Sequence, residues 1–526
     1  MSEAFTYATP EQFAGDLHDA RFGGGLAASG QQADFGGNVF GRDTWRTALD
    51  LMGNRSYRAF IRDMFGTLPQ WQGTYYDSLT NEYPGALPHQ VFREVVGGRQ
   101  LAAEQIERAE YWTGRWNVPM TIHPFSGRQF VIYNSSDSSL LFLIALAKFC
   151  RVSGRDVLRD KFIHWRTEEI RTVGEAALRC IEHIHDMFIE AEREGWEFYA
   201  MPSTNPRQTS PSTAMRDGLD AYVRHVRQPD GSVVVEPIDY GYVAYLENQA
   251  LCYEALLAAC ALFPDDFRVS DWRAQAEILR KATLEAFWDD ERGLFVPAID
   301  RHGPVMLESN AQCELLNGPF FDGLAEGPDY IRALVRWLYS PSVMTMIGPR
   351  MVSLKDAEPE GEYYAYQLTG AVWGVTTGII TEGLWRHELF EFGYDLGVLR
   401  LLWWFERARA TLELDYVHRQ TGMPVLATAS TLPRDARLVI AAPHLGQAPQ
   451  TWSASRALKV LWTIRHRQSD NRSWQRALWK ELYPAIKEVM CPIGRTTAPL
   501  EPVGVDFARG RDLQQQRFAR LAMSGY

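Results

Sequence analysis

The chain has 526 residues, of which 46% are hydrophobic and 23% charged, a composition that can bury one large core. Its net charge of −11 comes from acids and bases mixed along the chain. No basic block is present that could neutralise a run of phosphates, which excludes nucleic acid as the partner. The longest apolar run, residues 140–147, is too short to span a bilayer, and the first residues lack a signal-peptide pattern. We therefore expect a cytoplasmic protein that does not act on membranes.

The placing of the cysteines and the number of aromatic residues narrow the class of protein further. The six cysteines, at positions 150, 180, 252, 260, 313 and 491, include no CxxC pair and mostly lie in apolar stretches. We expect free thiols rather than a disulfide framework or a zinc site. Tryptophan, tyrosine and phenylalanine occur 17, 22 and 26 times. These rings either fill a large core or stack on the faces of sugars.

Helical periodicity dominates the chain. Apolar residues at i, i+3 and i+4 predict helices over residues 42–52, 138–152, 167–193, 242–262, 272–287, 330–338, 368–386, 389–412, 452–467 and 474–489. Ser270 and Asp271 are a start signal for the helix from Trp272. Strand-like alternation is confined to residues 232–235 and 438–441. The pattern indicates an all-α protein.

Long loops separate these helices. Residues 66–92, 112–137, 200–241 and 340–366 are rich in glycine, proline, asparagine and aromatic residues, and loops of such length are usually functional. We expect residues 1–465 to form one α-domain. Residues 466–526 should form a charged helix and an extended tail that packs on this domain or mediates association, which leaves a homo-oligomer open.

Seven segments combine polar, aromatic and glycine residues, several of them where a loop meets a helix. They cover residues 40–45, 82–93, 133–138, 215–220 with 236–237, 309–318, 363–373, and 415–422 with 450–454. In the first segment, Arg42 and Asp43 either cap the following helix or grip sugar hydroxyls through charge-assisted hydrogen bonds. In the third, Asp137 either caps the helix from Ser138 or belongs to a site.

The order and spacing of these segments resemble the amylo-α-1,6-glucosidase domain of glycogen-debranching enzymes. They are also similar to its (α/α)6-barrel relatives, the glucoamylases and the glucosylglycerate and mannosylglycerate hydrolases. The matching patterns are an FGRDT-like start, E-x-P-G…H…R, Y-x-S-x-D-x-x-x-L-F, S-N…L…G, a tyrosine-rich stretch before G-x-V-W, and Q-x-W-S-A. The resemblance implies an all-α (α/α)6 barrel with long loops on one face.

The resemblance also implies an inverting, exo-acting α-glycoside hydrolase of the α-glucosidase type. In this chemistry a carboxylic acid protonates the leaving oxygen, and a second carboxylate activates water on the opposite face of the sugar. The family's acid follows a W-K-D-S-like segment. Met215-Arg216-Asp217-Gly218 occupies that place here, without the tryptophan and the serine. Asp217 is therefore the candidate acid, and Asp220 is the alternative.

The position of the base is set by a turn later in the chain. The family places a glutamate seven residues before a T-G turn, and this offset from Gly422 leads to Asp415. Glu413 and Asp435 are the next candidates. The resemblance further implies that the substrate is bound by Arg42, Asp43, Trp45, His89, Arg93, Tyr133, Asp137, Asn310, Tyr364, Tyr366, Trp373, Gln450 and Trp452. No metal or organic cofactor is expected, because carboxylates and water suffice.

Two other functions remain open from the sequence. One is an (α/α)6-barrel sugar epimerase, in which His123 or His444 would supply acid/base chemistry. The other is a non-catalytic carbohydrate-binding barrel, an option that the aspartate at position 415 keeps open. The paired acids and the Q-x-W-S-A segment favour the hydrolase. In each case the expected partner is a small glycoside or an oligosaccharide.

Overall fold

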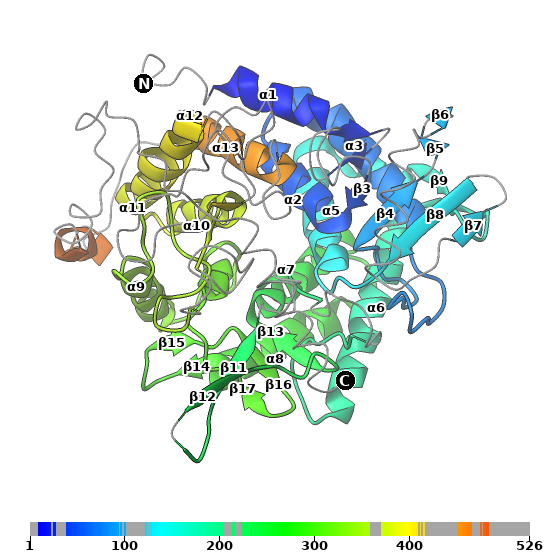
Figure 1. Cartoon of the computed structure of the whole chain (residues 1–526). Coiled ribbons are helices and arrows are strands. Elements are labelled where there is room, and N and C mark those ends of the chain that lie inside the picture. The colour runs from blue at the N-terminus through cyan, green and yellow to red at the C-terminus, as the bar shows by residue number, and fades with distance from the viewer. Residues whose placement is uncertain are drawn as a thin grey trace.

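Helices dominate the part of the chain that the structure describes (Figure 1). The computed structural model describes residues 9–22, 25–27, 38–93, 95–96, 99–100, 121–123, 127–203, 213–215, 222–230, 232–357, 370–408, 411, 414–415, 450–464, 474–475 and 477–482. Within these ranges, no helix combines the length and the apolar character that a membrane crossing requires.

Six elements contact one another in a closed circuit. In order they are α2 (Gly41–Leu51), α5 (Ser138–Ser153), α7 (Leu246–Leu262), the 3-10 helix η4 (Asn310–Leu316), α10 (Gly374–Arg386) and α13 (Thr451–Ile464), which packs on α2 again. Residues near the start of one element contact residues near the start of its neighbour, and residues near its end contact residues near the neighbour's end. Neighbouring elements of the circuit therefore run in the same direction. Trp373 meets Trp452 near the start of α10 and α13, for example, and Glu382 meets Lys459 further along.

Each member of the circuit has a partner on its outer side. These partners are α3 (Arg58–Thr67) on α2, α6 (Val173–Arg193) on α5, α8 (Val269–Phe287) on α7, α9 (Gly327–Leu338) on η4, the π-helical segment η6 (Asp395–Leu402) on α10, and α1 (Pro10–Asp19) on α13. The helices α11 (Phe390–Tyr394) and α12 (Trp403–Ala408) flank η6. Figure 1 shows α2, α5, α7, α10 and α13 around a common centre, with α1, α3, α6, α8 and α9 outside them. The prediction of a mainly helical fold is confirmed.

Several helices begin elsewhere than the periodicity predicts. The helix expected from Thr167 begins at Val173, because Thr172 and Glu175 form a capping box there. The helices expected from residues 242 and 368 are each preceded by a short strand, β13 (Val243–Tyr245) and β18 (Val372–Trp373). The start signal at Ser270 is also displaced, since α8 already begins at Val269.

The structure contains more strands than the sequence pattern predicts. An antiparallel sheet has the order β3 (Asn38–Phe40), β4 (Gln90–Arg93), β8 (Gly127–Ile132), β7 (Thr121–His123). Its strand β3 leads directly into α2. The strand predicted at 232–235 is confirmed as part of the hairpin of β11 (Val223–Arg227) and β12 (Val233–Pro237). The strand predicted at 438–441 lies outside the described residues.

The remaining elements are short. The strands are β1 (Arg21–Phe22), β2 (Gly25–Leu26), β5 (Val95–Val96), β6 (Arg99–Gln100), β9 (Lys161–Ile163), β10 (Ile170–Thr172), β14 (Trp288–Asp289), β15 (Leu294–Phe295), β16 (Ala298–Asp300), β17 (Gly303–Pro304) and β19 (Leu414–Asp415). The 3-10 helices are η1 (Arg55–Tyr57), η2 (Leu68–Trp71) and η3 (Arg155–Arg159).

The core lies between the circuit and its outer partners. Trp45 of α2 is fully buried, with its ring 5.4 Å from that of Phe65 on α3 and 5.1 Å from that of Phe142 on α5. Trp45 is therefore a core residue, and its contact with a sugar stays a prediction. The cysteines within the described ranges, Cys150, Cys180, Cys252, Cys260 and Cys313, are free thiols as predicted.

Candidate functional site

One face of α2 carries a row of buried charges. Arg42, Arg46 and Asp50 follow one another at four-residue spacing, which places them on one side of the helix. Each is at most 3% exposed, and buried charges need partners. The partners come from three different places: Asp137 before α5, Glu314 on η4 and Arg456 on α13. This face of α2 therefore looks into the circuit.

The deeper pairs fill the middle of the circuit. Arg46 Nη1 lies 2.8 Å from Glu314 Oε1, and α2 and η4 are three steps apart in the circuit of six. Burial alone would lower the pKa of Arg46, but the carboxylate of Glu314 outweighs it, so this pKa is raised above its ordinary value. One turn further, Asp50 contacts Arg456 at 3.0 Å, and Arg456 contacts Glu382 of α10 at 2.5 Å. Paired charges at this depth disfavour ligand entry there.

The predicted site residues gather at the other end of the circuit. Arg42 and Asp43 lie in the first turn of α2, Asp137 precedes α5, Asn310 begins η4, Trp373 precedes α10, and Gln450 and Trp452 lie at the start of α13. All are buried, and the rings of Trp373 and Trp452 are 6.0 Å apart. Because neighbouring helices run in the same direction, these residues share one end of the circuit although they are far apart in sequence.

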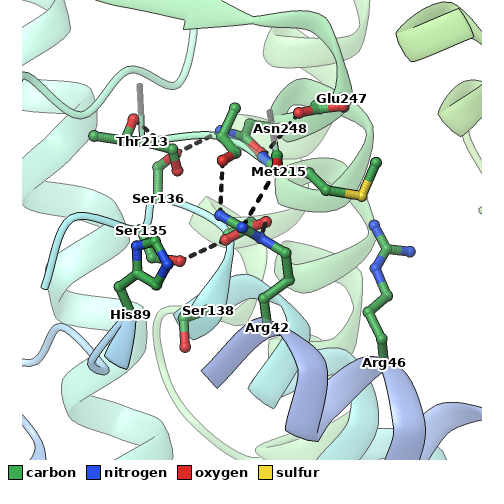
Figure 2. Close-up of polar contacts among 12 residues, drawn as sticks. Arg42, Arg46, His89, Ser135, Ser136, Ser138, Thr213, Met215, Glu247 and Asn248 are labelled. Carbon is green, nitrogen blue, oxygen red and sulfur yellow. Dashed lines mark hydrogen bonds and ion pairs between the residues drawn. The ribbon is translucent and has the colours of Figure 1, made fainter. Parts of the chain in front are cut away.

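Arg42 holds a buried stretch of backbone that precedes the predicted acid. Its Nε donates to Asp137 Oδ2 at 2.5 Å, its Nη2 to the Ala214 carbonyl at 2.7 Å and its Nη1 to the Met215 carbonyl at 3.5 Å (Figure 2). The guanidinium of Arg42 thus binds the protein itself, and its contact with sugar hydroxyls stays a prediction. Asp137 occupies the N-cap position of α5, but its side chain makes no capping hydrogen bond and instead accepts from Ser135 Oγ at 2.6 Å.

The charge on Asp137 is stabilised by these contacts. Burial by itself raises the pKa of its carboxyl group, but the ion pair with Arg42 and the hydrogen bonds from Arg42 and Ser135 act against it. The net result is a pKa below the ordinary value. Asp137 is therefore an anion that holds Arg42 in place, rather than a group poised to donate a proton.

Ser136 binds the same stretch of backbone and is itself held by two further side chains. The backbone N–H and the Oγ of Ser136 donate to the Thr213 carbonyl at 2.8 and 2.9 Å. Asn248 Nδ2 donates to Ser136 Oγ at 2.5 Å, and Tyr199 Oη donates to the Ser136 carbonyl at 2.8 Å. Asn248 and Tyr199 were not predicted. The signal for Asn248 was the polar sequence Glu-Asn-Gln at 247–249, inside an otherwise apolar helix.

Glu247 is the third site residue that the sequence analysis missed. It is the second residue of α7 and is 2% exposed. Its Oε1 accepts a hydrogen bond from the Met215 N–H at 3.0 Å and one from Tyr222 Oη at 3.4 Å. Figure 2 shows Glu247 and Arg42 on different sides of Met215. Residues 213–215 are thus held by α2, by α7 and by the segment leading into α5.

Two other predicted sugar contacts have structural roles in the described residues. Tyr133 is fully buried, and its Oη donates to the Trp71 carbonyl at 2.7 Å. His89 is buried, with its Nδ1 2.8 Å from the Asn134 carbonyl oxygen and its ring 5.5 Å from that of Phe40. Both residues tie loops to the start of the circuit, and their role in sugar binding stays a prediction.

The catalytic candidates are described only in part. Asp217, Asp220, Glu413, Asp435, Tyr364 and Tyr366 lie outside the described residues, as does the side chain of Arg93 at the end of β4. The backbone of Asp415 is described: in β19 it pairs with Val372, and Leu414 pairs with Trp373. Asp415 therefore lies beside the strand that leads into α10.

Of the two histidines of the epimerase alternative, His123 lies within the described residues. His123 ends β7, an edge strand separated by β8 and β4 from the strand that leads into α2. His444 lies outside the described residues.

Solved structures with the same fold belong to a GH63 mannosylglycerate hydrolase from Thermus thermophilus. Its structures with Tris, with glucose, and with Tris and D-glycerate have TM-scores of 0.51, 0.52 and 0.53 to this chain, at 14%, 13% and 13% sequence identity. Each match covers 86% of this chain and 99% of the other. No protein-family model and no curated protein matches the sequence. At such identity the likeness establishes the fold alone.

Proposed function

We propose that this protein is an inverting, exo-acting α-glycoside hydrolase built on an (α/α)6 barrel. In this proposal the six-element circuit is the inner ring, and its six packing partners are the outer ring. The closed order of contacts supports this architecture, as does the fold shared with the mannosylglycerate hydrolase. The active site lies at the N-terminal ends of the inner helices, where the predicted site residues gather.

One observation supports hydrolysis in particular: the segments that carry the two candidate carboxylates reach the circuit from opposite sides. Met215, two residues before Asp217, is held by Arg42 and Glu247, whose helices flank α5. Asp415 pairs with the strand that leads into α10. The helices α5 and α10 are three steps apart in the circuit of six. Inverting hydrolysis needs opposed carboxylates, because the acid and the water act on opposite faces of the sugar.

The two aspartates then have distinct roles. Asp217 donates its proton to the glycosidic oxygen as the bond from that oxygen to the anomeric carbon breaks. Asp415 accepts a proton from the water that attacks this carbon from the other face, which inverts its configuration. The two carboxyl groups would stand about 6.5–9.5 Å apart to admit the water. Asp220 is the alternative acid, and Glu413 and Asp435 are the alternative bases.

We propose a terminal or short α-glucoside as the substrate. In this proposal the rings of Trp373 and Trp452, which lie 6.0 Å apart at the same end of the circuit, pack against the sugar, and Asp43 in the first turn of α2 accepts hydrogen bonds from its hydroxyls. The similar hydrolase is named for a small glycoside, and one of its structures holds glucose. This supports a short substrate rather than a polymer.

The test compares two isosteric variants on two classes of substrate. Asp217→Asn should slow natural α-glucosides by about 10²–10⁴-fold, and it should slow α-glucosyl fluoride much less, because fluoride needs little protonation to leave. Asp415→Asn should slow both substrates alike, because each needs an activated water. Asp271→Asn is the matched control, since Asp271 is exposed on the outer helix α8.

Proton NMR of the first product settles the class of reaction. Release of β-glucose from an α-glucoside is expected for inversion. Release of α-glucose, isomerisation of a free sugar, or no reaction with a panel of α-glycosides would each contradict the proposal. Near-normal turnover by Asp415→Asn would leave the hydrolase in place and move the base to Glu413 or Asp435.

A further inference from the structure

Glu247 is a buried carboxylate in the candidate site to which the proposed reaction assigns no role. It lies in the first turn of α7, and two hydrogen bonds converge on its Oε1, one from the backbone of Met215 and one from the side chain of Tyr222. These two donors are close to the ends of the segment 216–221. One oxygen atom of α7 therefore ties together the two ends of the segment that contains Asp217.

Tyr222 is itself firmly placed. Its backbone N–H donates to Tyr240 Oη at 3.3 Å, and Tyr240 Oη donates to the Tyr222 carbonyl at 3.1 Å. Its ring lies 5.0 Å from that of Tyr245, the residue that precedes α7. The contact with Glu247 therefore joins α7 to the start of the hairpin of β11 and β12.

The charges around Met215 determine the direction of its peptide groups. The cation Arg42 binds the carbonyl oxygens of Ala214 and Met215, and the anion Glu247 binds the Met215 N–H. A carbonyl oxygen is attracted to a cation and an N–H to an anion, and in a buried setting such charge-assisted hydrogen bonds are strong. If the peptide group between Ala214 and Met215 were turned over, its N–H would face the cation Arg42 and its carbonyl oxygen would face the anion Glu247. Both contacts would then be repulsive. These charges therefore fix the orientation of the peptide group between Ala214 and Met215.

We propose that Glu247 is a positioning residue, which sets the location of the catalytic acid by fixing both ends of its segment. The inference rests on the proposed function, because it assigns the acid to residues 216–221. Glu247 acts through its acceptor oxygen and the length of its side chain, not through contact with the substrate. Displacing a catalytic group by about 1 Å can cost about 10²-fold in rate, so a loose segment should slow the chemical step.

The test uses three substitutions that separate the length of the Glu247 side chain from its charge. Glu247→Gln keeps an oxygen at the same distance, Glu247→Asp keeps the charge on a side chain one methylene shorter, and Glu247→Ala removes both. Glu254→Gln is the matched control, because Glu254 lies two turns further along α7, in an ion pair with Lys148 away from the site. Two properties are measured: the kinetics on an α-glucoside and on α-glucosyl fluoride, and amide hydrogen exchange of the peptide covering residues 213–222 without substrate.

The expected order of turnover is wild type, then the glutamine variant, then the aspartate variant, then the alanine variant. Glu247→Ala should lower kcat on the α-glucoside by about 10- to 100-fold with little change in KM, and lower it less on the fluoride. Exchange of the 213–222 peptide should rise in the alanine and aspartate variants and stay near the wild-type rate in the glutamine variant. If Glu247→Ala does not fold, the aspartate variant gives the same comparison.

Two results would overturn the proposal. Unchanged exchange and unchanged kcat in both the alanine and the aspartate variants would show that the segment is held without Glu247. An equal loss on both substrates in Glu247→Gln, with unchanged exchange, would show that the carboxylate acts on the reacting atoms. If the wild-type protein cleaves no glycoside, the proposed function fails, while the exchange measurement still decides whether Glu247 holds the segment.

Discussion

The ion pair between Arg42 and Asp137 offers a quantitative test of the site. Asp137→Leu leaves Arg42 as a buried cation, only 3% exposed and without the acceptor of its Nε. Breaking a buried pair in this way costs about 3–5 kcal/mol. Unfolding entropy is roughly 2.1 cal/mol/K per residue, or roughly 1.1 kcal/mol/K for 526 residues. The melting temperature should therefore fall by about 3–5 °C.

The double variant separates stability from function. Arg42→Met combined with Asp137→Leu replaces the pair by apolar groups, so most of the lost stability should return. Turnover should not return, because the guanidinium that binds the carbonyl oxygens of Ala214 and Met215 is then missing. Differential scanning calorimetry and α-glucoside kinetics measure the two effects. The reasoning is refuted if each single variant melts within about 1 °C of wild type, or if the double variant regains wild-type kcat.

The same pair predicts a pH dependence. The pKa of Asp137 is lower in the folded protein than its ordinary value of about 3.9. A group whose pKa is depressed by folding stabilises the protein above its unfolded pKa, and this contribution is lost as the pH falls toward the folded pKa. The difference in melting temperature between wild type and Asp137→Leu should therefore be full at pH 7 and shrink below about pH 4. A difference that is constant over this range would contradict the assignment.

Three further predictions test the packing around Gly41, the proposed contact of Trp452 with the sugar and the absence of a cofactor. Gly41→Ala should destabilise the protein by about 1–3 kcal/mol or more, because the added methyl group overlaps Ser138 Oγ. Gly66→Ala, with open space around it in α3, should instead stabilise by about 0.5–1 kcal/mol in the same melting assay. Trp452→Leu should raise KM by about 2- to 10-fold with little change in kcat. An unchanged KM would show that Trp452 does not contact the sugar. Treatment with EDTA should leave activity intact, and a loss restored by one divalent ion would contradict the metal-free mechanism.

Local sequence signals predicted helices better than they predicted where helices begin. The bounds of α5 and α13 agree with the periodicity to within a few residues, because an apolar stripe is a local property of the chain. The starts of α7 and α10 do not agree. The residues before them pair with β16 and β19, which are distant in sequence. A short strand exists only through its partner, so neither could be predicted locally.

The sequence indicated which residues lie near one another more clearly than what each of them contacts. The structure gathers Arg42, Asp137, Trp373 and Trp452 at one end of the circuit, as the order of the motifs indicated. Arg42 was nevertheless expected to bind a sugar, whereas its guanidinium binds backbone carbonyls. Carbonyl oxygens and sugar hydroxyls are both acceptors for a guanidinium. Residue type therefore could not distinguish these two roles.

The sequence by itself determined that this protein is mainly helical, that its cysteines are free where they are described, and which residues lie where loops meet helices. These properties follow from periodicity and composition, which depend on the order of residues within each local segment and not on contacts between distant segments. Only the tertiary structure decided what each polar group contacts. Tyr133 is bound to a backbone carbonyl, Trp45 is enclosed by the core, and Glu247 holds the backbone of Met215. The physical reason is that burial leaves a polar group dependent on its few nearest partners, and those partners come from elements that only the folded chain brings together.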